Sequence, residues 1–222
     1  MYIIMLGKPG SGKGTVGKML SENLKITHIS SGELFRSYIK KAGKIGEEIN
    51  RYVSEGKLVP DELAIKLVEK RLEEKDCENG VILDGFPRTA EQAEKLDEFL
   101  NNKKLKIDIA VELKLSDQEI IDRIVKRIEC SNSDCREIYN LEFKKPKIDG
   151  ICDKCGSKLI RREDDNIETV QKRLETYHNT SEKLINYYKN KDILYAIKLN
   201  IHSGKTSEDV AKEVTQYLEG KK

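Results

Sequence analysis

The sequence feature that most constrains the fold is the glycine-rich run Gly7-Lys-Pro-Gly-Ser-Gly-Lys-Gly-Thr15, which directly follows the apolar run Tyr2–Leu6. This pattern predicts a strand that enters a tight turn, followed by a helix over Lys13–Leu24. Glycines in such a turn let backbone N–H groups surround phosphate oxygens, and the N-terminus of the helix directs its positive dipole end toward them. Lys13 would add a cation for the β- and γ-phosphates. The sequence therefore predicts a nucleoside triphosphate site at the end of the first strand.

The residue after Lys13 departs from the general phosphate-binding loop. That loop places Ser or Thr directly after its lysine, where the hydroxyl binds Mg²⁺. Here Gly14 follows Lys13, and the hydroxyl comes one residue later, at Thr15. The spacing resembles the loop of the nucleoside monophosphate kinases, in which the metal is held mainly by phosphates and water.

Composition excludes several classes of protein. The 222 residues are enough for one core with insertions or for two small domains, and 36% charged against 37% hydrophobic residues is typical of soluble globular proteins. A net charge of +2 argues against a protein that mainly coats nucleic acid. The apolar runs are too short for a membrane span or a signal peptide, so we expect a cytoplasmic protein. In that compartment, the five cysteines favour metal binding over disulfides.

Apolar runs typical of buried strands alternate with stretches of helical pattern. The expected strands are Tyr2–Leu6, Ile26–Ile29, Val81–Asp84, Ile107–Leu113 and Ile193–Leu199. The expected helices are Lys13–Leu24, Glu33–Lys41, Ile45–Glu55, Asp61–Glu74, Ala90–Asn102, Asp117–Ile128, Ile167–Lys189 and Ser207–Leu218. This alternation predicts a parallel sheet covered on both faces. Ligands then bind beyond the carboxyl ends of the strands, where Gly7–Thr15 and Asp84–Arg88 both fall.

Two segments interrupt the alternation. Residues 30–59 form a helical detour after the second strand, and residues 130–160 carry cysteines, glycines and prolines without a helical pattern. We expect both segments to be insertions on a central α/β core. Neither contains a long Gly/Ser linker, so their boundaries are expected to be hinges.

Six motifs occur in order along the chain. They are Gly7–Thr15, Ser30–Arg36, Lys57–Glu62, Asp84–Thr89 with Gln92, Asp122-Arg123 through Arg127, and Arg162–Asp165 leading to Arg173. Together they resemble the adenylate kinases with a long lid, from Met1 to about Leu218. The resemblance implies a P-loop three-layer α/β fold with a five-stranded parallel sheet. It also implies a core of residues 1–29, 60–125 and 166–222, a helical insertion at 30–59 that binds the nucleoside monophosphate, and a zinc-binding lid at 126–165.

The activity implied by this resemblance is reversible phosphoryl transfer from Mg²⁺·ATP to AMP, giving two ADP, by a monomeric cytoplasmic enzyme of adenine nucleotide metabolism. A GTP-dependent kinase, or one that acts on another nucleoside monophosphate, is the alternative within the same class. A zinc-ribbon module that binds nucleic acid, fused to an ATP-binding regulator, is the alternative from another class. Its expected basic stripe with interleaved aromatics is missing, since aromatics are 6% of the chain and Trp is absent.

Arginine is the scarce cation of this sequence, with ten arginines against 31 lysines. Guanidinium groups suit phosphoryl transfer because they bind phosphates with two hydrogen bonds and stay charged. Six of the ten lie on the motifs above: Arg36, Arg88, Arg123, Arg127, Arg162 and Arg173. A solvated helix face would have used lysine, as the rest of the chain does.

By resemblance, one group of residues would bind the donor ATP. The group consists of Gly10, Ser11, Gly12, Lys13, Gly14, Thr15, Arg123, Arg127, Ile138, Tyr139 and Thr206. The loop amides and Lys13 would hold the phosphates, and the arginines would neutralise them as the lid closes. Tyr139 has an alternative interpretation as ordinary packing inside a small subdomain. Thr206, in the loop Gly204-Lys205-Thr206 that follows the last strand, would contribute main-chain contacts to the donor adenine.

A second group would bind the acceptor AMP. The group consists of Ser31, Arg36, Lys57, Leu58, Val59, Gly85, Phe86, Pro87, Arg88, Gln92, Arg162 and Arg173. Arg36 and Arg88 would bind the α-phosphate, and the Gln92 amide can pair with the adenine edge. Without the motif around it, Gln92 would be an ordinary polar residue on an amphipathic helix.

The residues expected to act on the transferring phosphoryl group are Lys13, Asp84, Arg88, Arg123, Arg162 and Arg173. Their role would be positioning and electrostatic stabilisation. Asp84 ends an apolar run, from which its carboxylate could orient Mg²⁺ through water, with help from Glu33. The alternative for Asp84 is a turn or helix-capping residue.

Four cysteines form two pairs of metal-ligand spacing, Cys130…Cys135 and Cys152…Cys155. Four thiolates satisfy tetrahedral zinc, and a segment this small has too little core to hold itself together otherwise. Such a site would be structural because no coordination position stays open. The alternatives are reduced structural thiols, or a site that uses Asp134 in place of one cysteine. Cys77 is expected to be a packed thiol without a role.

Overall fold

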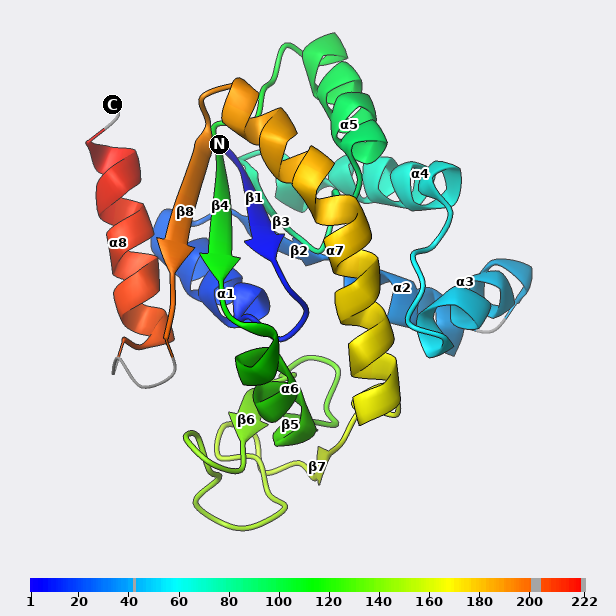
Figure 1. The fold of residues 1–222 in the computed structure, drawn as a ribbon, viewed down its shortest axis with the longest axis vertical. Coiled ribbons are helices and arrows are strands. Elements are labelled where there is room, and N and C mark those ends of the chain that lie inside the picture. The colour runs from blue at the N-terminus through cyan, green and yellow to red at the C-terminus, as the bar shows by residue number, and fades with distance from the viewer. Residues whose placement is uncertain (42, 201–204, 221–222) are drawn as a thin grey trace.

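The centre of the computed structural model is a five-stranded parallel sheet in the order β2-β3-β1-β4-β8 (Figure 1). The structure describes residues 1–41, 43–200 and 205–220. The strands are β1 (Tyr2–Gly7), β2 (Thr27–Ser30), β3 (Val81–Asp84), β4 (Ile109–Lys114) and β8 (Leu194–Lys198). All five predicted strands are therefore present, and the predicted parallel sheet is confirmed.

Helices cover both faces of this sheet (Figure 1). They are α1 (Lys13–Leu24), α4 (Asp61–Leu72), α5 (Ala90–Asn102), α7 (Ile167–Asn190) and α8 (Ser207–Glu219). Helix α6 (Asp117–Val125) lies beyond the carboxyl end of β4 and packs against α7 (Figure 1). Successive residues of β1 point to opposite faces, as in any strand. Ile3 therefore packs against α1 and α8, whereas Ile4 packs against α4, α5 and α7. The three-layer arrangement follows from this division of the core.

The segment after β2 contains two helices, α2 (Ser31–Lys40) and α3 (Lys44–Ser54), before α4 begins. The side chain of Ser30 caps α2 by accepting a hydrogen bond from the backbone N–H of Glu33 at 3.4 Å. The chain therefore turns directly from β2 into a helix at the carboxyl end of the sheet, and α2 and α3 lie beyond that end (Figure 1).

The cysteine-bearing segment forms a separate three-stranded antiparallel sheet in the order β6-β5-β7. Its strands are β5 (Arg127–Cys130), β6 (Ile138–Asn140) and β7 (Leu159–Ile160). The prediction that one helix spans Asp117–Ile128 is wrong at its end. Helix α6 stops at Val125, and Arg127–Cys130 is extended because it pairs with β6 on one side and β7 on the other. Pairing with distant residues overrides the local helical pattern.

Other element boundaries agree closely with the sequence. Strand β3 and helix α5 coincide with their predictions, and α6 begins with the capping box that Ser116 and Glu119 form. The predicted helix Asp61–Glu74 is two residues too long, since α4 ends at Leu72, and a separate 3₁₀ turn follows at Lys75–Cys77. Within the described residues, no helix is both long enough and apolar enough to cross a membrane.

Candidate active site and metal centre

The glycine-rich turn lies between β1 and α1, at the carboxyl edge of the sheet. Gly12 precedes α1 with a φ of 99°, in the left-handed region that favours glycine. A Cβ at Gly7 would lie 2.5 Å from the carbonyl oxygen of Leu113, so only glycine fits there. The residues from Gly7 to Thr15 line one cavity of about 350 Å³, except Lys8 and the buried Ser11. The predicted phosphate loop therefore has the expected geometry.

Lys13 points back across this turn. Its Nζ donates hydrogen bonds to the carbonyl oxygens of Gly7 and Lys8, both at 2.8 Å. Burial in the cleft lowers the pKa of Lys13 to about 8, and the nearby Asp84 carboxylate only partly opposes that effect. The ammonium is thus held at the loop without a carboxylate partner within ion-pair distance among the described residues.

Six arginines line the same cavity, and they are the six that the motifs single out. They are Arg36, Arg88, Arg123, Arg127, Arg162 and Arg173. Burial lowers the pKa of Arg36 to about 10, and the charge of Arg162 adds to the effect. Arg88 reaches the solvent of the cleft, yet desolvation by the cleft walls and the charge of Arg173 lower its pKa as well. Such a concentration of positive charge is a site for polyanions.

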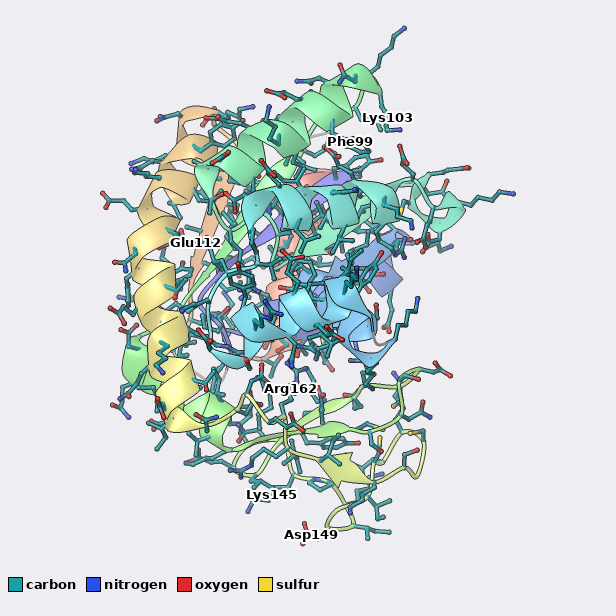
Figure 2. All side chains as sticks on the ribbon, turned by 90° about the vertical axis from the view of Figure 1, so that its right-hand side faces the viewer. Phe99, Lys103, Glu112, Lys145, Asp149 and Arg162 are labelled. Atoms are coloured by element: carbon teal, nitrogen blue, oxygen red, sulfur yellow. The ribbon has the colours of Figure 1, made fainter. Side chains whose placement is uncertain are left out.

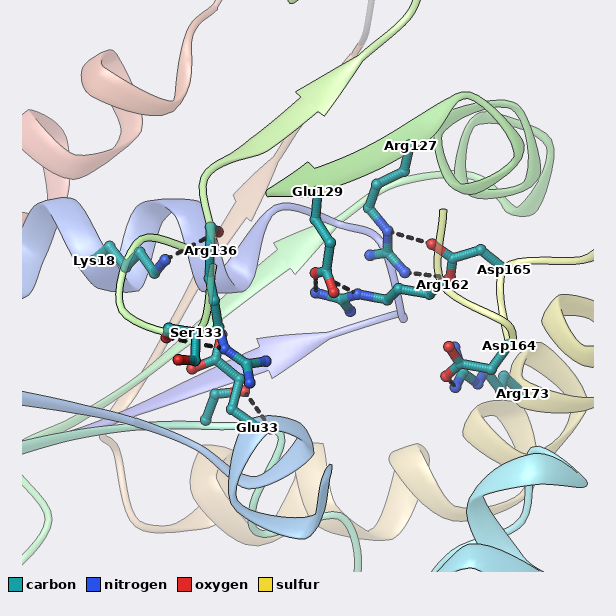
Figure 3. A network of polar contacts seen from close by, with 11 residues as sticks. Lys18, Glu33, Arg127, Glu129, Ser133, Arg136, Arg162, Asp164, Asp165 and Arg173 are labelled. Carbon is teal, nitrogen blue, oxygen red and sulfur yellow. Dashed lines mark hydrogen bonds and ion pairs between the residues drawn. The ribbon is translucent and has the colours of Figure 1, made fainter. Parts of the chain in front are cut away.

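Three of these arginines form ion pairs with carboxylates (Figure 3). Arg127 donates two hydrogen bonds to Asp165, at 2.8 and 2.5 Å. Arg162 donates from Nε to Glu129 at 2.6 Å, and Arg173 pairs with Asp164. The carboxylates hold these guanidinium groups in the wall of the cavity.

The other three cavity arginines lack a carboxylate within ion-pair distance among the described residues. The Nε atoms of Arg36 and Arg123 are buried and have no hydrogen-bond partner there. Arg88 donates only to the carbonyl oxygen of Gly85, at 2.8 Å. Buried donors without partners are rare in folded proteins, and they fit a site that a ligand completes.

Asp84 ends β3 and faces the glycine-rich turn. Its Oδ2 would lie 3.2 Å from a Cβ placed at Gly14, and it lies 3.9 Å from Nε2 of the half-buried His28. Asp84 and Glu33 both line the cavity, as the sequence predicts for carboxylates that face a hydrated metal.

Burial lowers the pKa of His28, so its imidazole stays neutral near pH 7.

The residues predicted to bind AMP line the part of the cavity near α2, α3 and α5. Lys57, Leu58, Val59, Phe86, Pro87 and Gln92 all contribute to its wall, as does Gly85. Ser31 is not at the wall but is buried, and a Cβ at Gly85 would lie 2.7 Å from its hydroxyl. That hydroxyl has no hydrogen-bond partner among the described residues.

Of the residues outside the loop that are predicted to bind ATP, some line the cavity and others do not. Ile138 and Tyr139 line the cavity, but the Tyr139 ring is buried among the cysteines, and its hydroxyl lies 3.5 Å from Sγ of Cys152. Thr206 caps α8 through its side chain, and the neighbouring Ser207 lines the cavity. Gly204 lies outside the described residues. The alternative interpretation of the Tyr139 side chain, as packing, agrees with this arrangement.

The four predicted ligand cysteines come together beside β5 and β6. Their sulfur atoms all lie within 4.8 Å of one another, with Cys130 to Cys155 at 3.4 Å and Cys135 to Cys152 at 3.7 Å. Tetrahedral zinc with Zn–S bonds of about 2.3 Å needs sulfur atoms about 3.8 Å apart. The cluster therefore fits a tetrahedral metal ion, and the exposed Asp134 is not needed as a ligand. Cys77 is buried in the main core, as predicted.

Sequence reasoning missed the residues that hold the functional side chains in place. It assigned no role to Glu129, Asp164 or Asp165, which pair with the cavity arginines. It also missed Asp61, which contacts Gln92, and Phe143, whose ring lies 5.4 Å from the Arg123 guanidinium. The Asp164-Asp165 pair beside Arg162 was a usable signal, but no local pattern identifies the partner of each carboxylate.

Comparisons with known proteins agree with this geometry. A sequence model of the adenylate kinase family matches residues 5–193. An adenylate kinase of Clostridium tetani is 49% identical over 197 residues, which cover 89% of this chain and 90% of the relative. One of Acetivibrio thermocellus is 43% identical over 222 residues, the full length of both chains. One of Syntrophomonas wolfei is 40% identical over 214 residues, which cover 96% of this chain and 99% of the relative.

Proposed function

This chain belongs to the adenylate kinase family, and on that premise we propose how the residues of its cleft carry out the transfer. The chain is a phosphotransferase that moves a phosphoryl group from ATP to AMP and forms two ADP. Such a reaction brings two polyanions together, so catalysis consists of positioning and of stabilising the charge that spreads over the transferring group. The observation that carries the proposal is the single cavity lined by the phosphate loop and by six of the ten arginines.

The donor ATP would occupy the half of the cavity that the glycine-rich turn forms. Backbone N–H groups between Gly10 and Thr15 would surround its phosphates at the N-terminus of α1. Lys13 would exchange its hydrogen bonds to backbone carbonyls for the β- and γ-phosphates. Arg123 and Arg127 enter the cavity from α6 and β5, where they would neutralise the same phosphates.

The acceptor AMP would occupy the half formed by α2, α3 and the loop after β3. Arg36 and Arg88 would bind its α-phosphate, since neither has a carboxylate partner in the described part of the chain that competes for the guanidinium. Gln92 would read the base, together with the backbone of Gly85 and the unpaired hydroxyl of Ser31. An anionic phosphate is already a nucleophile, so no general base is needed.

Arg162 and Arg173 would act between the two nucleotides. Each is held by one carboxylate, Glu129 and Asp164 respectively. An ion pair of this kind fixes a guanidinium in position while leaving some of its five donors for phosphate oxygens. We expect both arginines to stabilise the transferring phosphoryl group.

Two metals fit the chain in different ways. With ATP, Mg²⁺ would supply charge neutralisation between the phosphates, and Asp84 and Glu33 would hold its water ligands. Zn²⁺ would bind Cys130, Cys135, Cys152 and Cys155. Its role would be to hold the three-stranded sheet together, because four thiolates leave no position open for chemistry.

Two insertions would close over the nucleotides. We propose that residues 30–59 close over AMP and residues 126–165 over ATP, around a core of residues 1–29, 60–125 and 166–222. Figure 2 shows Asp149 and Lys145 at the far end of the second insertion and Arg162 on its side nearer α2 and α3. Closure would exclude water, which otherwise competes as phosphoryl acceptor.

The decisive experiment measures ADP formed from ATP with AMP, GMP, CMP or UMP offered separately, and the bound metal in the same preparation. AMP should give the highest kcat/KM, with one zinc per chain. Preference for another monophosphate, or for GTP as donor, would reassign the substrate within the kinase class. Binding of only one nucleotide per chain would contradict the two-site arrangement.

That the protein is a cytoplasmic monomer stays a prediction. Light scattering of the purified protein tests whether it is a monomer.

A further inference from the structure

The side-chain amide of Gln92 is held on both sides by fixed partners. Its oxygen accepts a hydrogen bond from the backbone N–H of Arg88 at 2.7 Å. Its nitrogen donates to Oδ1 of Asp61 at 2.6 Å. Gln92 is 2% exposed and forms part of the cavity wall. The amide is therefore oriented before any acceptor binds.

The two partners allow only one orientation of this amide. A backbone N–H can only donate, and an ionised carboxylate can only accept. If the amide rotated by 180°, its NH₂ group would face the N–H of Arg88 and its oxygen would face the carboxylate of Asp61. Both hydrogen bonds would be lost in a buried position, where unpaired polar groups are costly.

The fixed orientation leaves one particular pair of groups for a ligand. One lone pair of the amide oxygen and one hydrogen of the amide nitrogen have no protein partner among the contacts of Gln92. A 6-aminopurine offers the complementary pair, a donor at its amino group and an acceptor at N1. A 6-oxopurine offers the reverse pair, an acceptor at O6 and a donor at N1. The amide as held here fits only the first.

We propose that Asp61 is a positioning residue that makes the acceptor site selective for 6-amino over 6-oxopurine monophosphates. The inference rests on the proposed role of Gln92 in the acceptor site, and it adds the residue that fixes the Gln92 amide. Asp61 is the first residue of α4, and its Oδ2 accepts a hydrogen bond from the hydroxyl of Thr89 at 2.8 Å. Thr89 caps α5, the helix that carries Gln92. Each carboxylate oxygen of Asp61 therefore accepts a hydrogen bond, and the two together hold the carboxylate beside the amide.

The test compares AMP with inosine monophosphate, because the two bases differ only at the edge that Gln92 would contact. Asp61→Asn keeps the size of the side chain but replaces one of the two acceptor oxygens with an NH₂ group that can donate to the Gln92 oxygen. The partner of Gln92 can then donate as well as accept, so it no longer fixes a single orientation of the Gln92 amide. We expect the AMP-to-IMP ratio of kcat/KM to fall about tenfold, since one well-made bidentate contact discriminates bases by about that factor or more. The change should lie in KM for the acceptor, while KM for ATP stays near its wild-type value.

Two further variants separate positioning from stability. Glu62→Gln removes an exposed negative charge from the same first turn of α4 without touching Gln92, and it should leave the AMP-to-IMP ratio unchanged. Asp61→Ala is assayed beside Asp61→Asn in case the latter fails to fold, which circular dichroism detects. A role of Asp61 in stability alone would lower kcat/KM for AMP and IMP by the same factor and leave their ratio unchanged.

Gln92→Ala distinguishes failure of this inference from failure of the proposed acceptor site. If Gln92→Ala abolishes the preference for AMP and the folded Asp61 variants keep it, the inference about Asp61 is overturned while the role of Gln92 stands. If Gln92→Ala keeps the full preference, both are overturned. Loss of the preference in Gln92→Ala and in a folded Asp61 variant, with the ratio intact in Glu62→Gln, supports the inference.

Discussion

Arg127 and Asp165 form a two-bond ion pair that joins the two chain segments through which the cysteine-bearing insertion leaves and re-enters the core. The Asp165 side chain is 0% exposed and that of Arg127 is 15% exposed. The pair thus clamps both ends of the insertion beside the cavity (Figure 3). It also holds Arg127 where the donor phosphates are expected.

Replacing Asp165 with asparagine should loosen this clamp. Removing one partner of a buried ion pair costs about 3–5 kcal/mol, and asparagine keeps one acceptor, so we expect a loss of about 2–3 kcal/mol. For a chain of this size that corresponds to a fall in Tm of about 4–12 °C. Thermal unfolding followed by circular dichroism measures it. Asp149→Asn, an exposed aspartate of the same insertion, should leave Tm unchanged; an equal Tm in both variants would contradict the clamp.

Lys13→Met should nearly abolish turnover without unfolding the protein. Methionine keeps the length of the side chain but removes the cation that would lie on the β- and γ-phosphates. Loss of one strong electrostatic contact to the transition state lowers kcat by about 10²–10³. Coupled measurement of ADP formation gives the rate, and circular dichroism confirms the fold. Near-normal turnover would show that Lys13 holds the loop rather than the phosphates.

The pH dependence should report the pKa of Lys13 in the free enzyme. Burial lowers this pKa to about 8, so the ammonium loses its proton as pH rises through that value. The charged form binds phosphate, and kcat/KM for ATP should therefore fall above about pH 8, by about tenfold per pH unit. At saturating ATP the bound phosphates raise the pKa again, so kcat should stay level to higher pH.

Lys13→Arg provides the control for that profile. A guanidinium stays charged throughout the range, so the variant should show a lower rate without the fall above pH 8. The same alkaline fall in both proteins would assign it to a different group.

Arg88→Ala should lower turnover by about 10³, and Arg88→Lys by less, because lysine restores the charge but not the planar pair of donors. KM for AMP should rise more than KM for ATP, since we expect Arg88 to bind the α-phosphate of AMP. Steady-state kinetics with each substrate varied measure both. Arg51→Ala removes an exposed arginine of α3 and should behave as wild type.

Cys155→Ser should affect stability far more than chemistry. The four sulfur atoms form the only cluster of metal-ligand type found among the described residues, and the insertion has a small core around it. We expect the loss of bound zinc and a fall in Tm of about 10 °C, with turnover at 25 °C changed by less than about threefold. Metal analysis and a melting curve test this. Lys154→Gln, an exposed neighbour between two of the cysteines, should keep both values.

Local sequence patterns predicted the elements whose cause is local. The strand, turn and helix from Tyr2 to Leu24 follow from apolar periodicity and glycine placement within a few residues. Helix Ala90–Asn102 begins at a threonine cap, which is also a local signal. By contrast, Ile128 has a helical context in sequence but lies in a strand, because it pairs with Tyr139.

The sequence by itself determined three features, because residue type and spacing carry that information. They are the phosphate loop, the six arginines on the motifs, and the four cysteines at metal-ligand spacing. Only the tertiary structure decided which carboxylate holds which arginine, and that Asp61 holds Gln92. The two residues of each pair are 31 to 38 positions apart in the sequence. The pairs are Gln92 with Asp61, Arg162 with Glu129, and Arg127 with Asp165. Contacts at that separation depend on how whole elements pack, and no periodicity within a single helix or strand encodes them.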